Sequence, residues 1–178
     1  MEKNRQGLLH IYCGDGKGKT SAAVGMAVRA AGCGMKVLVI RFLKTENSVE
    51  VEVLRSIPGI TVPPCERTFG FVFRMTEEQK QEAALYYQSR FEAAAKEAVQ
   101  GQYDLLILDE ILASCNYGMV RETSVVEFLQ NRPEKLEVVL TGRNPSETFL
   151  ELADYVSEIC MRRHPYEKGI PARRGIEF

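Results

Sequence analysis

The chain has 178 residues, of which 45% are hydrophobic and 26% are charged, and its formal net charge is −1. This composition is typical of a globular protein in water, and the small net charge gives no general attraction to nucleic acid or to an acidic membrane surface. Because no stretch approaches the roughly 20 apolar residues that span a bilayer, we expect a cytoplasmic protein with neither a membrane nor a nucleic acid as partner.

In the first part of the chain, short hydrophobic runs alternate with helical patterns. A buried strand is expected at 8–13, followed by a glycine-rich turn and an alanine-rich helix that ends near Gly32 or Gly34. A second strand is expected at 36–43. The stretch 49–57 alternates hydrophobic and acidic residues as a strand does, but its spacing and the proline that follows fit a short helix equally well.

The remaining elements continue this alternation. A short strand at 60–64 is stopped by prolines, and Thr76 with Gln79 forms a capping box that predicts a helix running to about Val99. Further strands are expected at 104–110, 136–142 and 155–162, further helices at 123–133 and 145–153, and an extended tail after them. Strands separated by helices predict an α/β fold with a mostly parallel sheet and helices on both faces, in a single domain over 1–178.

The five cysteines are scattered, and no two of them have the C-x-x-C spacing. This pattern argues against a disulfide framework and against a closed zinc site. We expect free thiols in a reducing compartment.

The stretch HIYCGDGKGKTSAAVG (10–25) is close to the phosphate-binding pattern G-x-x-x-x-G-K-[ST], but Cys13 stands where its first glycine would be. A strand, a glycine-rich turn and a helix beginning near Lys19 place backbone N–H groups and a positive helix end at one point. A glycine-rich turn without a ligand is the alternative. The prediction is that the phosphates of a nucleotide are bound by Gly14, Asp15, Gly16, Lys17, Gly18, Lys19, Thr20 and Ser21, with a loop geometry that differs from the standard one.

The run DLLILDE places Asp109 and Glu110 at the carboxyl end of a buried strand, where ligands bind in open parallel sheets. We expect Asp109 and the Thr20 hydroxyl to hold Mg²⁺ and Lys19 to contact the terminal phosphates. Glu110 is a candidate base, a second metal contact or a substrate contact, and a solvated acidic pair is the alternative. Arg143 follows another predicted strand and is a candidate nucleotide contact or a surface arginine.

Several segments, in order from about Leu8 to Phe178, make the chain resemble the P-loop class of ATP:corrinoid (cob(I)alamin) adenosyltransferases. They are GDGKGKTSAAVG, FGFVF, LDE, TGRNPSETFLELADYVSEI and KGIPARRGIEF. The resemblance implies a P-loop NTPase-like three-layer fold and a cytoplasmic enzyme of cobalamin biosynthesis. In such an enzyme, Co(I) of a reduced corrinoid attacks C5′ of MgATP and inorganic triphosphate leaves.

The resemblance further implies that ATP lies in the loop in the reverse sense, that Lys19, Thr20 and Glu110 are catalytic, and that Phe71 and Phe73 contact the corrinoid. Aromatic residues of this family fill the face of the corrinoid that its lower ligand vacates. It also implies a homodimer and a reductase that supplies electrons to cobalt.

The chain departs from the family pattern at three places. Asp15 replaces an asparagine of the loop, Phe73 replaces a tryptophan, and only about seven residues precede the first predicted strand, so a cap over the corrinoid would be absent or supplied by a partner subunit. Without the resemblance, Phe69, Phe71 and Phe73 would be expected to form one face of a core strand. Two other functions remain open: a small-molecule kinase or NTPase, and a nucleotide-gated corrinoid-binding module without turnover.

Overall fold

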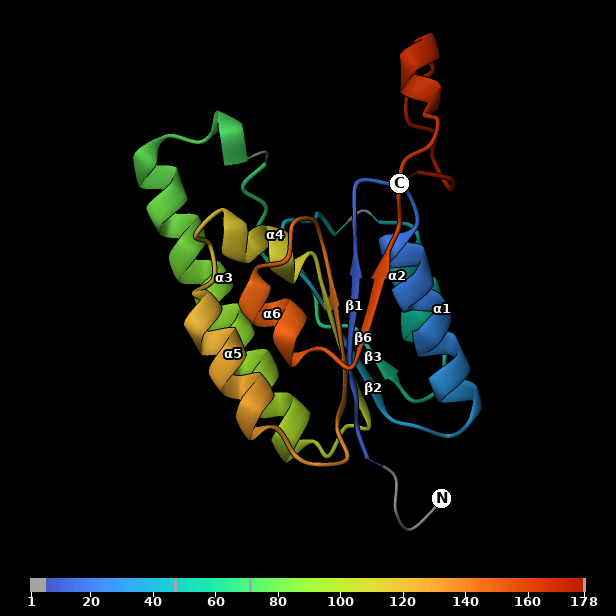
Figure 1. Cartoon of the computed structure of the whole chain (residues 1–178), viewed down its shortest axis with the longest axis vertical. Coiled ribbons are helices and arrows are strands. Elements are labelled where there is room, and N and C mark those ends of the chain that lie inside the picture. The colour runs from blue at the N-terminus through green and yellow to red at the C-terminus, as the bar shows by residue number, and fades with distance from the viewer. Residues whose placement is uncertain (1–5, 47, 71, 178) are drawn as a thin grey trace.

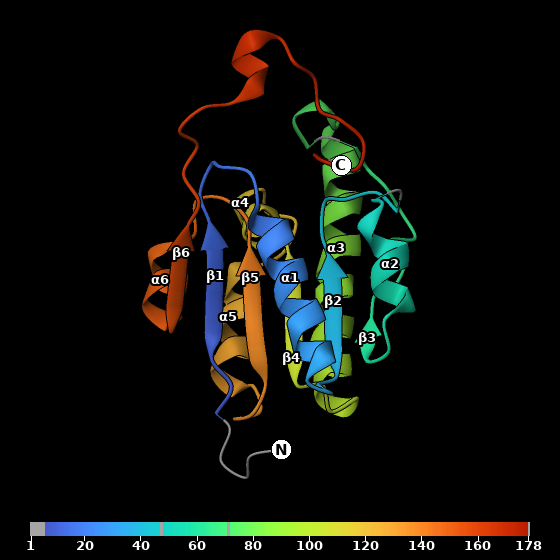
Figure 2. The ribbon, with the colours of Figure 1, turned by 90° about the vertical axis from the view of Figure 1, so that its right-hand side faces the viewer.

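The computed structural model describes residues 6–46, 48–70 and 72–177. Six strands form one sheet in the order β3-β2-β4-β5-β1-β6, and the pairings in this part of the chain are all parallel. Their carboxyl ends therefore lie together at one end of the sheet (Figures 1 and 2). The strands are β1 (Leu9–Cys13), β2 (Val37–Arg41), β3 (Ile60–Thr61), β4 (Leu105–Asp109), β5 (Glu137–Thr141) and β6 (Tyr155–Glu158).

Helices cover both faces of the sheet, as predicted. Figure 2 shows α1 and α2 on one face and α3 to α6 on the other, so the molecule has three layers. The α-helices are α1 (Lys19–Gly32), α2 (Glu50–Ser56), α3 (Glu77–Gln100), α4 (Ile111–Asn116), α5 (Glu122–Asn131) and α6 (Glu147–Leu152), and the 3-10 helices are η1 (Val72–Arg74) and η2 (Pro165–Lys168).

The central strands divide the core into two layers. Along β2, Leu38 and Ile40 pack toward the layer of α3 to α6, whereas Val37 and Val39 pack toward α1 and α2. Successive side chains of a strand point to opposite faces, so a strand covered on both sides must be hydrophobic at every position. All five residues of β4 are buried for the same reason, which fixes where the strand ends and presents Asp109.

The local signals at helix ends explain why α3 begins where it does. The Thr76 side chain accepts a hydrogen bond from the Gln79 N–H (3.3 Å), and the Thr76 N–H donates to the Gln79 side chain (2.9 Å), so the predicted capping box is confirmed. Two glutamates in the first turn complement the positive end of the helix dipole.

Several predicted elements differ in the structure. The ambiguous stretch 49–57 is a helix, the last strand ends at Glu158 rather than at residue 162, and the tail contains the 3-10 helix η2. Helix α4 was not predicted. The core strand considered for residues 69–73 is wrong for the described part of that segment, because Phe73 lies in η1 and is 77% exposed; Phe71 lies outside the described residues.

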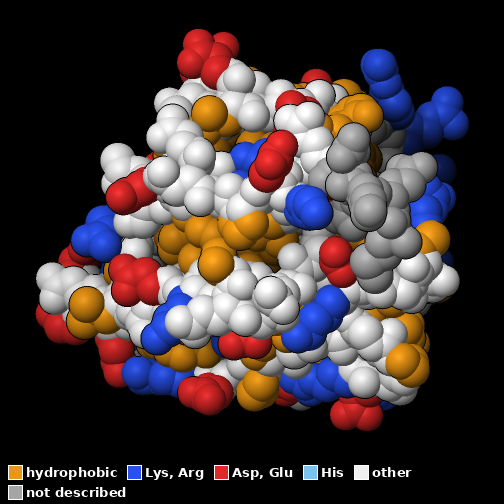
Figure 3. Space-filling view, turned by 90° about the horizontal axis from the view of Figure 1, so that it is seen from below, with side chains coloured by type: hydrophobic (Ala, Val, Ile, Leu, Met, Phe, Trp, Pro, Cys, Tyr) orange, Lys and Arg blue, Asp and Glu red, His pale blue; other side chains and the backbone are white. Residues whose placement is uncertain are grey.

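The end of the molecule where the strands begin carries side chains of both charge signs around hydrophobic ones (Figure 3). This mixture is consistent with the net charge of −1. In the described part of the chain, none of the helices combines the length and the hydrophobicity that crossing a bilayer requires.

Candidate active site

The glycine loop connects β1 to α1 at the carboxyl end of the sheet (Figure 1). Cys13 is the last residue of β1, and the first residue with a positive φ is Gly14 (φ 102°). The loop closes at Gly18 (φ 123°), directly before α1. Because left-handed backbone is required at Gly14 and not at Cys13, the turn tolerates a side chain where the standard pattern has its first glycine.

The chain that follows β6 packs tightly against the loop. The Gly16 N–H donates to the Ile159 carbonyl (2.7 Å), so this amide is directed at the protein rather than toward a ligand. A Cβ atom at Gly16 would lie 2.6 Å from the same carbonyl oxygen. Glycine is therefore needed here because another backbone approaches closely.

The amino end of α1 has no protein group that satisfies it in the way α3 is satisfied. Its N-cap, Gly18, makes no side-chain capping bond, and its first turn contains no acidic residue. The first N–H groups of a 14-residue helix and its positive dipole end are thus directed at the loop. This arrangement favours an anion.

Lys19 crosses the inside of the loop. Its ammonium donates to the Gly14 carbonyl (2.8 Å) and to the Gly16 carbonyl (2.9 Å), and the residue is only 8% exposed. Burial lowers the pKa of Lys19, and the nearby Glu110 carboxylate opposes this shift. Since an ammonium has three N–H donors, Lys19 braces the loop with two and retains one for a ligand.

Thr20, in the first turn of α1, and Asp109, at the end of β4, meet although β5 lies between β1 and β4 in the sheet. The Thr20 hydroxyl donates to one carboxylate oxygen of Asp109 (3.0 Å), and the Thr141 hydroxyl donates to the same oxygen (2.7 Å). The Lys44 ammonium lies 2.8 Å from the Thr20 hydroxyl and 2.5 Å from the other Asp109 oxygen. The structure therefore brings the two predicted metal ligands together around a cation.

Glu110 follows Asp109 in a left-handed conformation (φ 63°) and is the N-cap residue of α4. Its N–H donates to the Thr141 hydroxyl (2.9 Å), which holds the turn in place. Burial raises the pKa of the Glu110 carboxyl, and the charge of Asp109 adds to the increase. Lys19, Lys44 and Arg143 are close enough to lower this pKa in part, so Glu110 and the predicted contact Arg143 share one electrostatic neighbourhood with Lys19.

The other loop residues face the C-terminal chain. The Asp15 carboxylate accepts a hydrogen bond from the Met161 N–H (2.8 Å), and this bond lowers the pKa of Asp15. The Lys17 ammonium lies 3.4 Å from the Glu177 carboxylate at the molecular surface. Asp15 is therefore held by protein, whereas Lys17 reaches outward.

A cavity of about 560 Å³ opens beside the first turns of α1. Its walls include Thr20, Ser21 and Lys44, together with the tail residues Gly175 to Glu177. The predicted contact Ser21 thus lines a cavity that also includes Lys44, and residues near the end of the chain form part of its wall.

The described residues of the aromatic segment, 69–70 and 72–74, lie at the amino end of α3, at the same end of the molecule as the glycine loop (Figure 1). Phe69 is partly buried against Tyr86 and Tyr87, with ring centroids 5.6 and 5.8 Å apart. Phe73 projects into solvent, with the Arg74 guanidinium 5.5 Å from its ring centroid.

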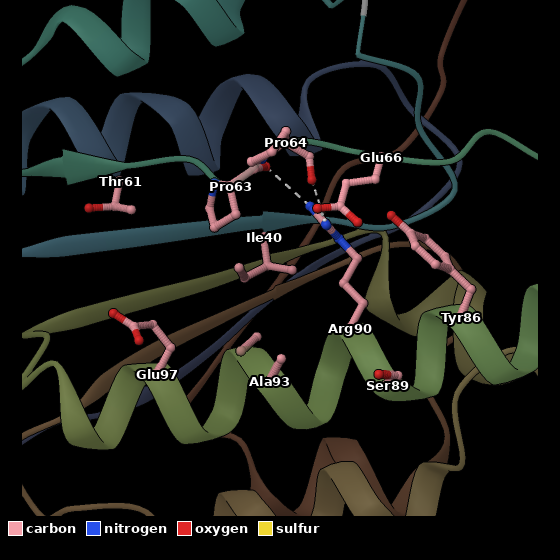
Figure 4. Close-up of a pocket in the computed structure, with 11 residues that line it drawn as sticks. Ile40, Thr61, Pro63, Pro64, Glu66, Tyr86, Ser89, Arg90, Ala93 and Glu97 are labelled. Carbon is pink, nitrogen blue, oxygen red and sulfur yellow. Dashed lines mark hydrogen bonds between the residues drawn. The ribbon is translucent and has the colours of Figure 1, made fainter.

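Arg90 fastens the chain that leads to this aromatic segment. Its guanidinium donates to the carbonyls of Pro64 (2.8 Å), Pro63 (3.2 Å) and Arg41 (3.1 Å). Figure 4 shows Arg90 rising from α3 to these prolines across a cavity of about 590 Å³. The segment after β3 is thereby tied both to α3 and to the end of β2.

The sequence analysis missed Lys44 and Thr141. Both residues were within reach of its own reasoning, since Thr141 is the last residue of β5 and Lys44 lies three residues beyond β2. Polar side chains at the carboxyl ends of neighbouring parallel strands meet at one edge. Applying that rule to every strand, rather than to the acidic one alone, would have identified them.

Comparison with known proteins gives a consistent result. The family model described as ATP:corrinoid adenosyltransferase BtuR/CobO/CobP matches residues 5–178. A corrinoid adenosyltransferase of Pseudomonas aeruginosa is 32% identical over 99% of this chain and 86% of its own length. The corrinoid adenosyltransferase of Escherichia coli K12 is 29% identical over 99% of this chain and 88% of its own.

A solved structure supports the fold independently. The cytoplasmic domain of EssC aligns with a TM-score of 0.52 and 15% identity, over 97% of this chain and 37% of that chain. Such a likeness concerns the arrangement of the elements alone. Because the family model extends over almost the whole sequence, the chain belongs to the ATP:corrinoid adenosyltransferase family.

Proposed function

We propose that this protein transfers the 5′-deoxyadenosyl group of ATP to the Co(I) centre of a reduced corrinoid and releases inorganic triphosphate. In this reaction the cobalt–carbon bond forms as the bond between C5′ and the triphosphate oxygen breaks. The observation that carries the proposal is the meeting of Thr20, Asp109 and a cation beside a glycine loop braced by Lys19, in a chain of this family.

The loop residues Gly14 to Ser21 would bind the triphosphate. Lys19 retains one N–H donor, α1 directs its uncapped amino end at the same place, and Lys17 reaches outward beside them. Negative charge grows on the triphosphate as it leaves, so fixed donors at this point stabilise the transition state more than the bound substrate.

The donor atoms present suit Mg²⁺. The Thr20 hydroxyl and the Asp109 carboxylate are oxygen ligands, and both already contact one cation, the Lys44 ammonium. In the described part of the chain, no group of three or more acidic, histidine or cysteine residues forms a metal site. This fits an ion that is held by one carboxylate, a hydroxyl, water and substrate phosphates, and that supplies neutralising charge to the triphosphate.

The remaining contacts follow from the same scheme. Glu110, a partly buried residue next to Asp109 whose carboxyl pKa is raised by desolvation, would contact the nucleotide or the metal shell. The cobalt is itself the nucleophile, so no side-chain base is needed. Phe71 and the exposed ring of Phe73 would contact the corrinoid.

We further propose a cytoplasmic homodimer of one domain per chain that receives electrons from a reductase.

Product analysis tests the function. The protein is incubated without oxygen with MgATP and a chemically reduced corrinoid, while the cobalt absorption spectrum is followed and phosphate products are separated. Adenosylcorrinoid and triphosphate in equal amounts are expected. ADP as the product would instead indicate a kinase or NTPase, and binding of both ligands without turnover would indicate a binding module. Either result would reject the proposal.

A further inference from the structure

Lys44 occupies the place in the structure where the proposed metal ligands converge. Its ammonium contacts the Thr20 hydroxyl at 2.8 Å and Asp109 at 2.5 Å, while Thr20 and Asp109 are 3.0 Å apart. These three groups form a closed triangle. A divalent ion bound to the same two oxygens could not coexist with the ammonium in this position.

The two partners differ in how easily each can move. The Asp109 side chain is 3% exposed and fixed by Thr20 and Thr141. Its buried charge therefore needs some cation beside it at all times. The Lys44 side chain is 21% exposed and borders the cavity beside α1. Its long unbranched side chain can turn into that cavity at low cost.

The backbone that carries Lys44 is held on its far side. The Glu46 carboxylate accepts hydrogen bonds from the Arg41 guanidinium (2.8 Å) and from the Cys65 N–H (2.8 Å). Arg41 also donates to the Thr45 carbonyl (2.9 Å). A movement of Lys44 would therefore be confined to its side chain, and the strand end would not shift with it.

From these contacts we infer that Lys44 is an exchangeable counter-ion of Asp109. In the nucleotide-free protein its ammonium neutralises the carboxylate and excludes divalent metal. When the metal arrives with polyphosphate, the ammonium is released into the cavity, where phosphate oxygens can accept its hydrogen bonds. This inference rests on the proposed MgATP site, and it makes Lys44 a positioning residue that allows metal to bind only together with nucleotide.

The test measures Mn²⁺ alone on nucleotide-free protein, by loss of the electron paramagnetic resonance signal of the free ion. Lys44→Met keeps the side-chain length and removes the charge. Removing a positive charge in contact with the metal ligands is expected to tighten Mn²⁺ binding at least about tenfold. The double variant Lys44→Met/Asp109→Asn should lose this gain, and Lys96→Met, at an exposed position of α3, should bind Mn²⁺ as the unmodified protein does.

An Mn²⁺ affinity of Lys44→Met within about twofold of that of the unmodified protein would overturn the inference, because removal of a cation that competes with the metal for Asp109 must tighten metal binding. Lys44→Gln, which keeps a polar end, decides the matter if Lys44→Met does not fold. Failure of both variants to fold would also overturn it, since a cation essential to the fold is not exchangeable. Adenosyl transfer by the unmodified protein is assayed separately: its absence would reject the proposed function and leave the metal result standing.

Discussion

Replacing Lys19 by alanine tests the role of the loop most directly, because this side chain has a structural and a chemical part. The structural part is two charge-assisted hydrogen bonds to the Gly14 and Gly16 carbonyls, each worth about 1.5–3 kcal/mol where water cannot replace them. The loop lies at the molecular surface, so in the variant water can bind the two carbonyls and recover much of the free energy of the lost hydrogen bonds. We expect the free energy of unfolding to fall by about 1–3 kcal/mol, which lowers Tm by about 2–12 °C for a chain of this size.

The chemical part is the third N–H donor. Removing one preorganised donor from a developing anion typically costs about 10²–10³-fold in kcat, and loss of the charge adds to that. Initial rates of adenosylcorrinoid formation should therefore fall at least about 10²-fold at a temperature where the variant is fully folded. Thermal melting followed by circular dichroism measures the loss of stability separately. Lys96→Ala, at an exposed position of α3, is the matched control. Full activity in a folded Lys19→Ala protein would refute the assignment of the loop.

Three further predictions concern the loop, the α3 cap and the thiols. Gly14→Ala should destabilise the protein more than Gly18→Ala: both positions have positive φ, which costs about 1–2 kcal/mol for alanine, but only at Gly14 would the new Cβ meet the Ile159 carbonyl; equal unfolding midpoints in urea would contradict this. Thr76→Ala should cost about 1 kcal/mol through loss of the capping box, and Ser89→Ala within the same helix is the comparison for the melting curves. Burial raises the pKa of Cys115 to about 12, so near pH 8 only about 10⁻⁴ of it is thiolate, and native-state alkylation followed by mass spectrometry should label the exposed Cys33 and Cys160 well before Cys115.

The sequence was sufficient where a local pattern determines the structure. The hydrophobic run of β4 ends at Asp109 because the strand is buried on both faces up to that residue. The capping box at Thr76 depends on residues only three positions apart. The short helix α4 was missed because six residues directly after a strand offer too little periodicity for a pattern to be recognised.

Contacts between distant segments could not be predicted in the same way. Lys44 and Asp109 are brought together by the parallel register of β2 and β4, and Lys17 meets Glu177 only because the tail turns back over the loop. For Lys17 and Glu177, nothing in the sequence near either residue indicates the partner, whereas Lys44 and Asp109 could have been paired by applying to β2 the rule that the ends of neighbouring parallel strands meet. The exposure of Phe73 belongs to the same class, because it depends on η1 turning its side chain away from the core.

The displaced glycine of the loop now has a physical explanation that does not require a degraded site. Cys13 lies outside the turn because it is still part of β1, where it pairs with Glu158 of β6. The turn then runs from Gly14 to Gly18, with Lys19 bracing its carbonyls from inside. Since the Gly16 N–H is committed to Ile159, much of the attraction for an anion must come from Lys19 and from the amino end of α1.

The contrast between α1 and α3 strengthens this argument. Helix α3 neutralises its own amino end with Thr76, Gln79 and two glutamates, whereas α1 has a glycine N-cap and no acid in its first turn. A side-chain cap is worth about 1 kcal/mol, and although α2 and α5 also lack one, each of them has an acidic residue in its first turn, which α1 does not. The 14-residue helix α1 thus leaves its amino end, which starts with Lys19 and Thr20 beside Asp109, without a cap or an acid, which is the arrangement expected if a polyphosphate completes the cap.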